Sequence, residues 1–362
     1  MVMVRIAVIG CGCIGKEHIR NVEACPGAKV AACVDPNPRM RTEAANLTSA
    51  PVFEDVEELR EEETDAVIVC VPNHLHVVVC EKVMGKYHVL CEKPVATNLE
   101  DCRKLESKLS EDKVFAVGLE YRHIPTMRRL LETLPSVGNL KLLAIREHRF
   151  PFLSKVESWN RENQKTGGTL VEKGCHFFDF MALCARGLVP QTVFARGGQA
   201  VNHLSSADVD DHALVVVDFG SGLLCTLELC MFAEASLNQL EVSAVGEKGK
   251  IEAFAPAHGV RSNDLRANFR VGIREDRDWE SRTTPPPPSA VLEEHVAMDF
   301  EHGDHAGSTY VELLEFCDAC RTLANNNLAT LHDATLSVAI GVAAHRSISE
   351  NRLVRLDELL AF

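Results

Sequence analysis

Residues 4–35, VRIAVIGCGCIGKEHIRNVEACPGAKVAACVD, contain the pattern that decides the fold of this chain. The apolar run Val4–Ile9 leads directly into the glycine-rich turn GCGCIG at residues 10–15. A helix-like segment follows, and a second apolar run at residues 30–34 ends at Asp35. This order predicts a strand, a tight turn, a helix and a second strand, which is the opening unit of a doubly wound sheet.

The three glycines of the turn have separate physical roles. Gly10 permits the tight turn off the strand, and Gly15 lets the helix pack closely on that strand. A side chain at Gly12 would block a pyrophosphate, to which the following helix N-terminus offers unpaired N–H groups. We therefore predict a dinucleotide site, with a plain tight turn as the alternative. Its predicted contacts are Gly10, Gly12, Cys13, Ile14, Gly15 and Asp35.

The charge at residue 35 bears on which dinucleotide binds. Asp35 lies where a carboxylate accepts hydrogen bonds from both ribose hydroxyls, and it repels the 2′-phosphate of NADP. Arg39 and Arg41 follow closely; they soften this preference or are simply solvated charges at the start of the next helix. The predicted cofactor is NAD, with NADP less favoured.

Length and composition limit the class of protein. A chain of 362 residues is long enough for two domains, and 46% apolar with 25% charged residues is typical of a globular protein. A net charge of −14 argues against nucleic acid or an anionic membrane surface as the main partner. No apolar run is long enough for a signal peptide or a membrane span, so a cytoplasmic protein is expected.

The 14 cysteines are expected to be reduced thiols, many of them buried as small apolar residues. Cys317 and Cys320 form one isolated C-x-x-C within a helical pattern, without the second pair that a zinc site needs. No metal site is therefore predicted.

Strand and helix patterns alternate through residues 1–122, which we predict to form a dinucleotide-binding domain with a doubly wound parallel sheet. The apolar run AVIVCVP at residues 66–72 is typical of a buried parallel strand. Further strands are predicted at residues 87–91 and 114–118, and helices near residues 76–85 and 99–110.

Residues 123–362 are predicted to form a substrate-binding and oligomerisation domain. Alternating apolar and polar residues predict a large, mostly antiparallel open sheet, with strands at residues 140–150, 192–199, 211–219, 223–231, 239–246 and 250–253. Helices are predicted near residues 125–134, 169–186, 308–324 and 333–349, and a proline-rich surface loop at residues 281–289.

Polar residues follow two of the predicted parallel strands, at the edge where open sheets bind ligands. In Glu92-Lys93-Pro94 the proline stiffens a turn that could aim Lys93 into the crevice; the alternative is a surface lysine beside a turn proline. The segment PNHLH at residues 72–76 is expected to run past the cofactor. The predicted cofactor contacts from these two turns are Pro72, Asn73, His76, Glu92 and Lys93.

The segment GGTLVEKGCHFFD at residues 167–179 combines a histidine with carboxylates at helical spacing. On one helix, Glu172 and His176 share a face at i,i+4, and His176 and Asp179 share it at i,i+3. Nearby carboxylates can orient a histidine and tune its pKa, as a general base requires. The alternative is a half-buried histidine that is satisfied by a neighbouring acid.

Taken together, these motifs resemble the glucose–fructose oxidoreductase / inositol dehydrogenase / MocA family over nearly the whole chain. The resemblance rests on the GCGCIG turn, CEKPVA at residues 91–96, GGTLVEKGCHFFD at residues 167–179 and VAIGVAAHRSISENRLVRL at residues 338–356. It implies an NAD-dependent dehydrogenase of a cyclic polyol or sugar, with an inositol-type substrate first. Alternatives are another ring substrate (an aldose, aminosugar or dihydrodiol), transient use of NAD in glycoside hydrolysis, or a non-catalytic NAD-binding regulator.

The resemblance also implies roles for residues. Lys93 is similar to the lysine that contacts the substrate hydroxyl and the nicotinamide, and His176 to the catalytic histidine, so that no metal is needed. Glu172 stands where many members carry Asp, and either contacts substrate or only orients His176. Lys173 adds a positive charge beside the site, and Asp179 is expected to have a supporting role.

The substrate pocket is less clearly marked in the sequence. Besides Lys93, Glu172 and His176, the predicted substrate contacts are Arg122 at the domain junction, Trp159, Asn160 and His305. For Trp159, packing within a loop is the equal alternative. Relatives bury the free face of the open sheet against another subunit, so a homodimer or homotetramer is expected.

Overall fold

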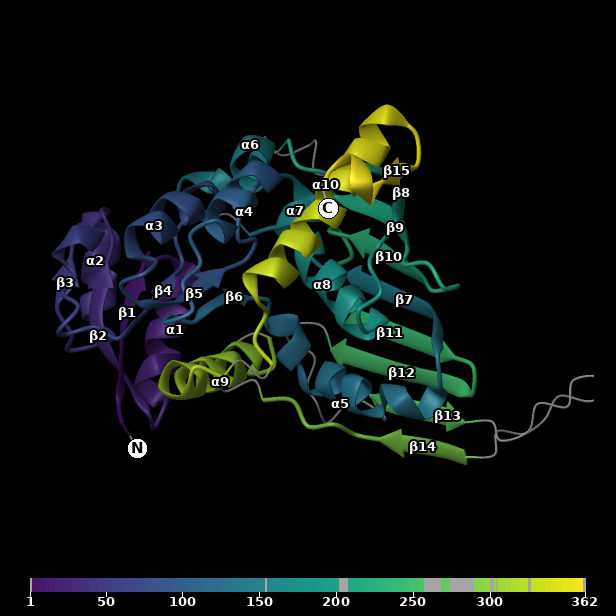
Figure 1. Cartoon of the computed structure of the whole chain (residues 1–362), viewed down its shortest axis with the longest axis horizontal. Helices are drawn as coiled ribbons and strands as arrows, with labels where there is room; N and C mark the ends of the chain where they lie inside the picture. The colour runs from purple at the N-terminus through teal and green to yellow at the C-terminus, as the bar shows by residue number, and fades with distance from the viewer. Residues whose placement is uncertain are drawn as a thin grey trace, which may run out of the picture.

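A computed structural model of the chain describes residues 2–153, 155–201, 208–256, 268–273, 290–299, 303, 305–324 and 327–360. Two sheets lie side by side, and helices cover each of them (Figure 1). The loop predicted at residues 281–289 lies outside the described residues. Within those described ranges, no helix is both long and apolar enough to cross a membrane.

The first sheet is parallel and has the strand order β3-β2-β1-β4-β5-β6. Its strands are β1 (Val4–Ile9), β2 (Ala28–Val34), β3 (Val52–Phe53), β4 (Ala66–Val69), β5 (His88–Glu92) and β6 (Phe115–Gly118), and its helices are α1 (Cys13–Ala24), α2 (Pro38–Ala45), α3 (His76–Val83) and α4 (Leu99–Glu106). The chain order reverses between β1 and β4, and ligands bind at such a switch point. The predicted doubly wound fold is confirmed.

The second sheet has the order β14-β13-β12-β11-β7-β10-β9-β8-β15. Its strands are β7 (Leu140–His148), β8 (Thr192–Gly198), β9 (His212–Asp218), β10 (Leu224–Cys230), β11 (Asn238–Gly246), β12 (Gly249–Pro256), β13 (Phe269–Ile273), β14 (Ala290–Glu294) and β15 (Val354–Arg355). Among these described strands, β7 and β10 run parallel, and all other neighbours are antiparallel. The mostly antiparallel open sheet is therefore confirmed, although β13, β14 and β15 were not expected.

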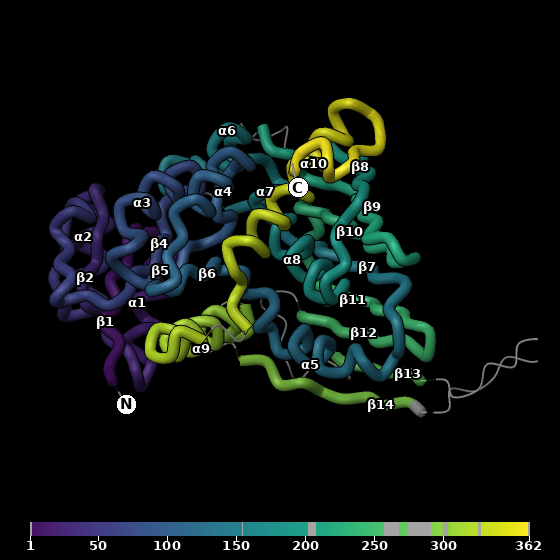
Figure 2. The backbone as a smooth tube through the Cα atoms, in the orientation of Figure 1, coloured from purple at the N-terminus to yellow at the C-terminus, as the bar shows by residue number. Residues whose placement is uncertain are grey.

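Helices cover one face of the second sheet. They are α5 (Pro125–Thr133), α8 (Gly174–Ala185) and α10 (Leu331–Glu350); α5 contacts β12, and α10 contacts both α8 and β8. Figure 2 shows these helices on the same side of the strands. Alternate residues of β9 point toward them and are buried, whereas Leu214 and Val216 are 61% and 39% exposed on the opposite face.

One late helix returns to the first sheet. In α9 (Ser308–Thr322), Leu313 and Phe316 are buried in the same apolar cluster as Ile6 and Val8 of β1. Figure 1 shows α9 beside α1, and Ala329 forms a bridge with Val117 of β6. Segments after residue 122 thus return to the first sheet. The predicted boundary between the two domains at residue 122 stays a prediction.

Two predicted helices differ in detail. The single helix expected at residues 169–186 is divided into α7 (Thr169–Glu172) and α8, because the chain departs from ideal helix at Lys173 and continues with the poor helix former Gly174. The last helix begins at Leu331, earlier than predicted, because Thr330 and Asp333 form a reciprocal cap at its N-terminus.

Candidate active site

The glycine turn has the shape that a dinucleotide needs. Gly10 has φ +91°, and a Cβ there would lie 2.7 Å from the carbonyl carbon of Cys70. A Cβ at Gly15 would lie 1.9 Å from the oxygen of Gly10, so helix and strand meet without side chains. A Cβ at Gly12 would meet nothing within 4 Å, and no described side chain caps the helix that begins at Cys13. Phosphate can therefore approach the backbone at Gly12.

Asp35 directly follows β2, beside this turn, and is held by the backbone. Its carboxylate accepts hydrogen bonds from the N–H groups of Cys11 (2.7 Å) and Asn37 (2.8 Å). Arg39 pairs with Glu43 at 2.8 Å, and Arg41 donates to the carbonyl oxygen of Asp35 at 2.9 Å. Both arginines thus have partners other than the Asp35 carboxylate.

The turn after β4 is joined to the turn after β5. The His76 ring lies between the carbonyl oxygens of Val71 (2.9 Å) and Pro94 (2.7 Å). Asn73, which begins η2 (Asn73–Leu75) after Pro72, is buried and donates its side-chain N–H to Glu172 Oε2. His76 thus joins the two turns of the first sheet, and Asn73 connects that sheet to Glu172 of α7.

The Glu92-Lys93-Pro94 turn places Lys93 between the end of β5 and Glu172 of α7. Glu92 accepts a hydrogen bond from His18 of α1 at 2.8 Å, so it holds the turn against the dinucleotide helix. Lys93 Nζ donates to the carbonyl oxygen of Glu172 at 3.1 Å and lies 3.6 Å from Glu172 Oε1. Burial opposes the charge on Lys93, but the Glu172 carboxylate and other acidic groups outweigh burial and raise the pKa of Lys93.

Glu172 is a charged anchor within this group. Its carboxylate is 3% exposed and lies 3.8 Å from Lys155 Nζ, in addition to its contacts with Lys93 and Asn73. Burial opposes ionisation, but the two lysines and the Asn73 hydrogen bond outweigh burial and lower the pKa of Glu172. Glu172 therefore faces Lys93.

His176 lies on α8 and has a different carboxylate neighbour from the one expected. Its side chain is 1% exposed, and its Nδ1 atom lies 3.7 Å from Glu120 Oε2. Its ring stacks on Tyr121, with centroids 4.2 Å apart. Burial lowers the pKa of His176 well below its ordinary value, and the charges of Lys93 and Lys173 lower it further. His176 is thus a neutral imidazole at neutral pH, which is the form that accepts a proton.

Lys173, at the break between α7 and α8, is buried below Tyr121. Its Nζ donates to the Tyr121 hydroxyl at 2.5 Å and lies 3.1 Å from Glu147 Oε1. Burial lowers the pKa of Lys173 to about 8. The positive charge predicted beside the site is therefore present, and it is largely balanced by Glu147.

The four weaker substrate candidates have different surroundings. Arg122 forms a buried, two-pronged ion pair with Asp179, and Asp333 lies 3.5 Å away. Asn160 accepts from the Lys155 N–H at 3.2 Å and donates to the Leu153 oxygen at 2.8 Å, which shapes its own loop. Trp159 is 9% exposed and packs under the Lys155 ammonium group, and His305 lies 3.6 Å from Glu120 Oε1.

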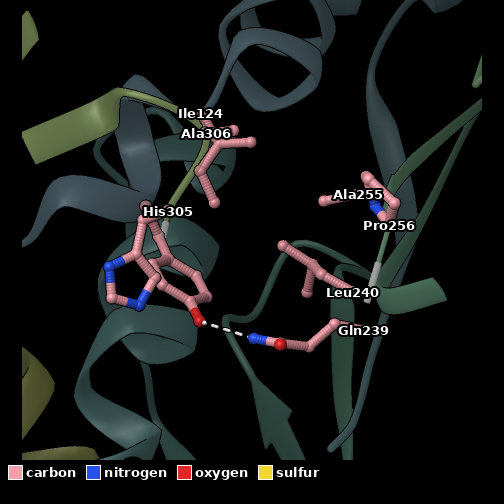
Figure 3. Close-up of a pocket in the computed structure, with 8 residues that line it drawn as sticks. Ile124, Gln239, Leu240, Ala255, Pro256, His305 and Ala306 are labelled. Atoms are coloured by element: carbon pink, nitrogen blue, oxygen red, sulfur yellow. Dashed lines mark hydrogen bonds between the residues drawn. The ribbon is translucent and has the colours of Figure 1, made fainter. Parts of the chain in front are cut away.

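A pocket opens between Tyr121 and the second sheet (Figure 3). Its polar side has His305, the Tyr121 hydroxyl and the Gln239 amide, which donates to that hydroxyl at 3.5 Å. Its remaining wall is apolar and consists of Ile124, Leu240, Ala255, Pro256 and Ala306. Among the described residues, His305 is the one predicted substrate contact that lines this pocket, and Lys93, Glu172 and His176 are not part of its lining.

Several residues at the site were not predicted from the sequence. Tyr121 and Gln239 line the pocket, and Glu120 and Lys155 contact the candidate catalytic residues. Glu120 begins η3 (Glu120–His123) two residues after the end of β6, and the carboxyl end of a parallel strand is the signal that could have identified it. Lys155 stands four residues before Trp159 in a loop without regular pattern, and only the folded chain brings it to Glu172.

Known proteins share this architecture. The NAD-binding Rossmann-fold domain of the GFO_IDH_MocA oxidoreductase family matches residues 4–119, and the C-terminal alpha/beta domain of that family matches residues 135–356. The chain is 27% identical to a myo-inositol 2-dehydrogenase of Thermotoga maritima, over 98% of this chain and 99% of that protein.

Solved structures have the same fold. A probable dehydrogenase from Thermotoga maritima matches with a TM-score of 0.76 at 25% identity, covering 99% of this chain and 100% of that one. A levoglucosan dehydrogenase bound to NADH and levoglucosan matches with a TM-score of 0.80 at 17% identity, over 98% and 99% of the two chains. The chain belongs to the glucose–fructose oxidoreductase / inositol dehydrogenase / MocA family of oxidoreductases, and its cofactor is NAD.

Proposed function

We propose that the protein oxidises a secondary alcohol of a cyclic polyol or sugar with NAD, with an inositol-type ring as the first candidate. One observation carries this proposal: a neutral imidazole and a charged ammonium group meet at the carboxyl edge of the NAD-binding sheet. Lys93 follows β5, and Nδ1 of His176, on α8, lies 3.7 Å from Glu120, which follows β6. Lys93 and His176 are close enough that the charge of Lys93 contributes to lowering the pKa of His176. An alcohol oxidation needs such a base and such an electrostatic stabiliser together.

The two groups have complementary roles. His176, uncharged because of its burial, removes the hydroxyl proton of the substrate. Lys93, which keeps its proton because Glu172 stands beside it, stabilises the negative charge that develops on the alcohol oxygen. Each environment therefore favours the protonation state that its role needs.

Glu172 and Asn73 hold this pair in position. Glu172 contacts Lys93 through both its carbonyl oxygen and its carboxylate, and Asn73 ties the same carboxylate to the turn after β4. Because its charge favours the Lys93 cation, Glu172 orients Lys93 rather than His176 in this proposal.

The chain fits NAD at the other end of the site. The open space at Gly12 admits a pyrophosphate, and Asp35 can offer its carboxylate lone pairs to a ribose. When bound, the nicotinamide ring supplies the hydride acceptor. The chain's own contribution is to place the alcohol carbon against that ring, between Lys93 and His176.

The pocket wall favours a second candidate substrate. Ile124, Leu240, Ala255, Pro256 and Ala306 offer carbon surface rather than hydrogen-bonding groups. A ring that carries an apolar substituent, such as the methyl group of an N-acetyl aminosugar, would bury it there. A fully hydroxylated ring would use mainly the side of Tyr121, Gln239 and His305.

The test is a comparison of substrates with NAD. The substrates are a panel of myo-inositol, aldoses and N-acetyl aminosugars. We expect NADH, detected by its absorbance, to form with at least one of them. Preference for the N-acetyl sugar would favour the second candidate. Tight NAD binding without turnover on any ring substrate would contradict the proposal and support a non-catalytic regulator.

The exposed face of the second sheet supports an oligomer. Phe194, Leu214, Leu224 and Leu142 lie on neighbouring strands and are 39%, 61%, 41% and 51% exposed on the face away from the helices. An apolar face of this kind is stabilised by burial against a second copy. We propose a dimer or tetramer assembled through it; a stable monomer of 39.8 kDa in light scattering would refute this.

A further inference from the structure

Glu120 lies between two histidines, and each of its carboxyl oxygens faces a different ring. Oε2 lies 3.7 Å from Nδ1 of His176, and Oε1 lies 3.6 Å from Nδ1 of His305. His176, Glu120 and His305 thus form a row in which side-chain exposure rises. The His176 side chain is 1% exposed, that of Glu120 8% and that of His305 27%. The row therefore leads from the buried base toward solvent.

We propose that Glu120 relays a proton from His176 to His305, so that the buried base does not hold a positive charge after it takes the substrate proton. This inference rests on the proposed function, since it assumes that His176 accepts a proton. Glu120 is a positioning and relay residue here, because it acts through His176.

The unused ring atom of His176 supports the relay. Among the described residues, Nδ1 of His176 forms no hydrogen bond although it is buried. To accept a proton from the substrate, His176 must have its lone pair on Nε2, which places the resting proton on Nδ1, facing Glu120. The gaps of 3.7 and 3.6 Å exceed a hydrogen bond by about half an ångström, and such contacts often tighten when substrate binds.

The protons balance in one concerted step. His176 takes the alcohol proton on Nε2 and passes its Nδ1 proton to Oε2 of Glu120. Oε1 of Glu120 releases its proton to Nδ1 of His305, and His305 releases one from Nε2 to solvent. One proton leaves and each side chain is neutral again, with His176 and His305 now protonated on the opposite ring nitrogens. Proton exchange with water that enters after the product leaves returns both rings to their starting tautomers before the next cycle.

The surroundings of Glu120 suit this exchange. Burial, with a contribution from Glu92, raises the pKa of Glu120 to about 8, so its carboxyl group is protonated at neutral pH. Burial lowers the pKa of His305 to about 3, so His305 does not retain the proton. The titratable groups that face Glu120 from the packed elements are Glu92, Lys93, Lys173, Cys175, His176, His305 and Glu312. Above pH 8 the carboxylate accepts the proton directly.

The discriminating variant is Glu120→Gln. Its amide has the same shape and can still accept from His176 and donate to His305, but it cannot pass a proton on. On the best ring substrate we expect kcat to fall roughly 10- to 100-fold, with KM and the Kd of NAD within about threefold. The solvent deuterium isotope effect on kcat should rise, and small imidazole buffers should restore part of the rate.

Glu315→Gln is the matched control. Glu315 also faces a histidine, with Oε2 3.8 Å from Nδ1 of His123, but it lies outside the site. Its kcat and isotope effect should equal those of the wild type. Wild-type kcat in Glu120→Gln, or a lower kcat without an isotope effect and without buffer rescue, would overturn the relay.

A measurement without turnover separates this inference from the proposed function. Nitrogen NMR of the wild type should show the proton of His176 on Nδ1 and that of His305 on Nε2. A proton on Nε2 of His176 would overturn the relay even if the enzyme is active or Glu120→Gln does not fold. Absence of any dehydrogenase activity would instead overturn the proposed function. The measured tautomers would then still show whether the protons of His176 and His305 are placed as the relay requires.

Discussion

The cofactor end and the catalytic junction are built in opposite ways. The cofactor end is one continuous segment, residues 4–35, whose decisive contacts are made by the backbone: Asp35 is held by the Cys11 N–H, and Gly12 leaves the approach open. The catalytic junction is assembled from distant segments. Lys93 follows β5, Glu120 follows β6, His176 lies on α8 and His305 precedes α9.

The two regions encode their functions at different levels of structure. A glycine turn works by the absence of side chains, so a short sequence pattern is enough to identify it. The junction works by the charge states of side chains that meet only after folding, such as Glu172 beside Lys93 and Glu120 beside His176. The two regions should therefore respond separately to substitution, and the predictions below test that separation.

The largest expected effect is the loss of turnover without loss of cofactor. We expect His176→Ala and Lys93→Ala each to lower kcat by roughly 10²–10⁴-fold, because they remove the base and the alkoxide stabiliser. The Kd of NAD, measured by titration calorimetry, should stay within about threefold, since neither residue belongs to the glycine turn. Wild-type turnover in His176→Ala would contradict the general-base role.

The next effect concerns Arg122, which the sequence suggested as a substrate contact and the structure pairs with Asp179. Arg122→Ala leaves a buried carboxylate without its partner, so we expect the free energy of unfolding to fall by about 3–5 kcal/mol. Denaturant unfolding measures this. Arg128→Ala, which removes a half-exposed partner of Glu315, is the control and should cost at most about 1 kcal/mol.

A different outcome would assign Arg122 to the substrate site instead of to the structural core. If Arg122→Ala kept the wild-type stability but raised KM for the ring substrate, the side chain would be a substrate contact, as the sequence suggested. Replacing the pair together, as Arg122→Met with Asp179→Leu, should recover most of the lost stability, because no buried charge is left unpaired.

Most of the fold and part of the candidate site could be predicted from the sequence. Five of the six described strands of the first sheet were predictable because continuous apolar runs and glycine signals are local, whereas the two-residue strand β3 was not predicted. The interruption at Lys173 was not, because Gly174 is only a weak local signal in a pattern that is helical on both sides, and the contacts of Lys173 with Tyr121 and Glu147 form only after folding. For the same reason the predicted pairing of Glu172 with His176 gave way to Lys93 and Glu120, which are distant in sequence.

At the cofactor end, Asp35 should determine which dinucleotide is preferred. Asp35 should make NAD bind at least about tenfold more tightly than NADP, or about 1.4 kcal/mol, because its carboxylate repels a 2′-phosphate. Asp35→Ser should remove most of this difference while kcat with saturating NAD stays near that of the wild type. Equal affinities in the wild type would mean that Arg41, which already contacts the Asp35 carbonyl oxygen, compensates for the acid.

The smallest effect concerns Glu172, and it decides which partner Glu172 serves. In the wild type, the low pKa of His176 and the raised pKa of Lys93 place the acid limb of kcat/KM below pH 6.5 and the basic limb above pH 10.5. Glu172→Gln should lower kcat about tenfold at neutral pH. It removes the main charge that raises the pKa of Lys93, while burial continues to lower that pKa, so the basic limb should move toward neutral pH and the acid limb should stay in place. If the acid limb moved instead, Glu172 would act through His176, as the helix spacing alone suggested, and the separation of Lys93 and His176 into two independently tuned groups would fail.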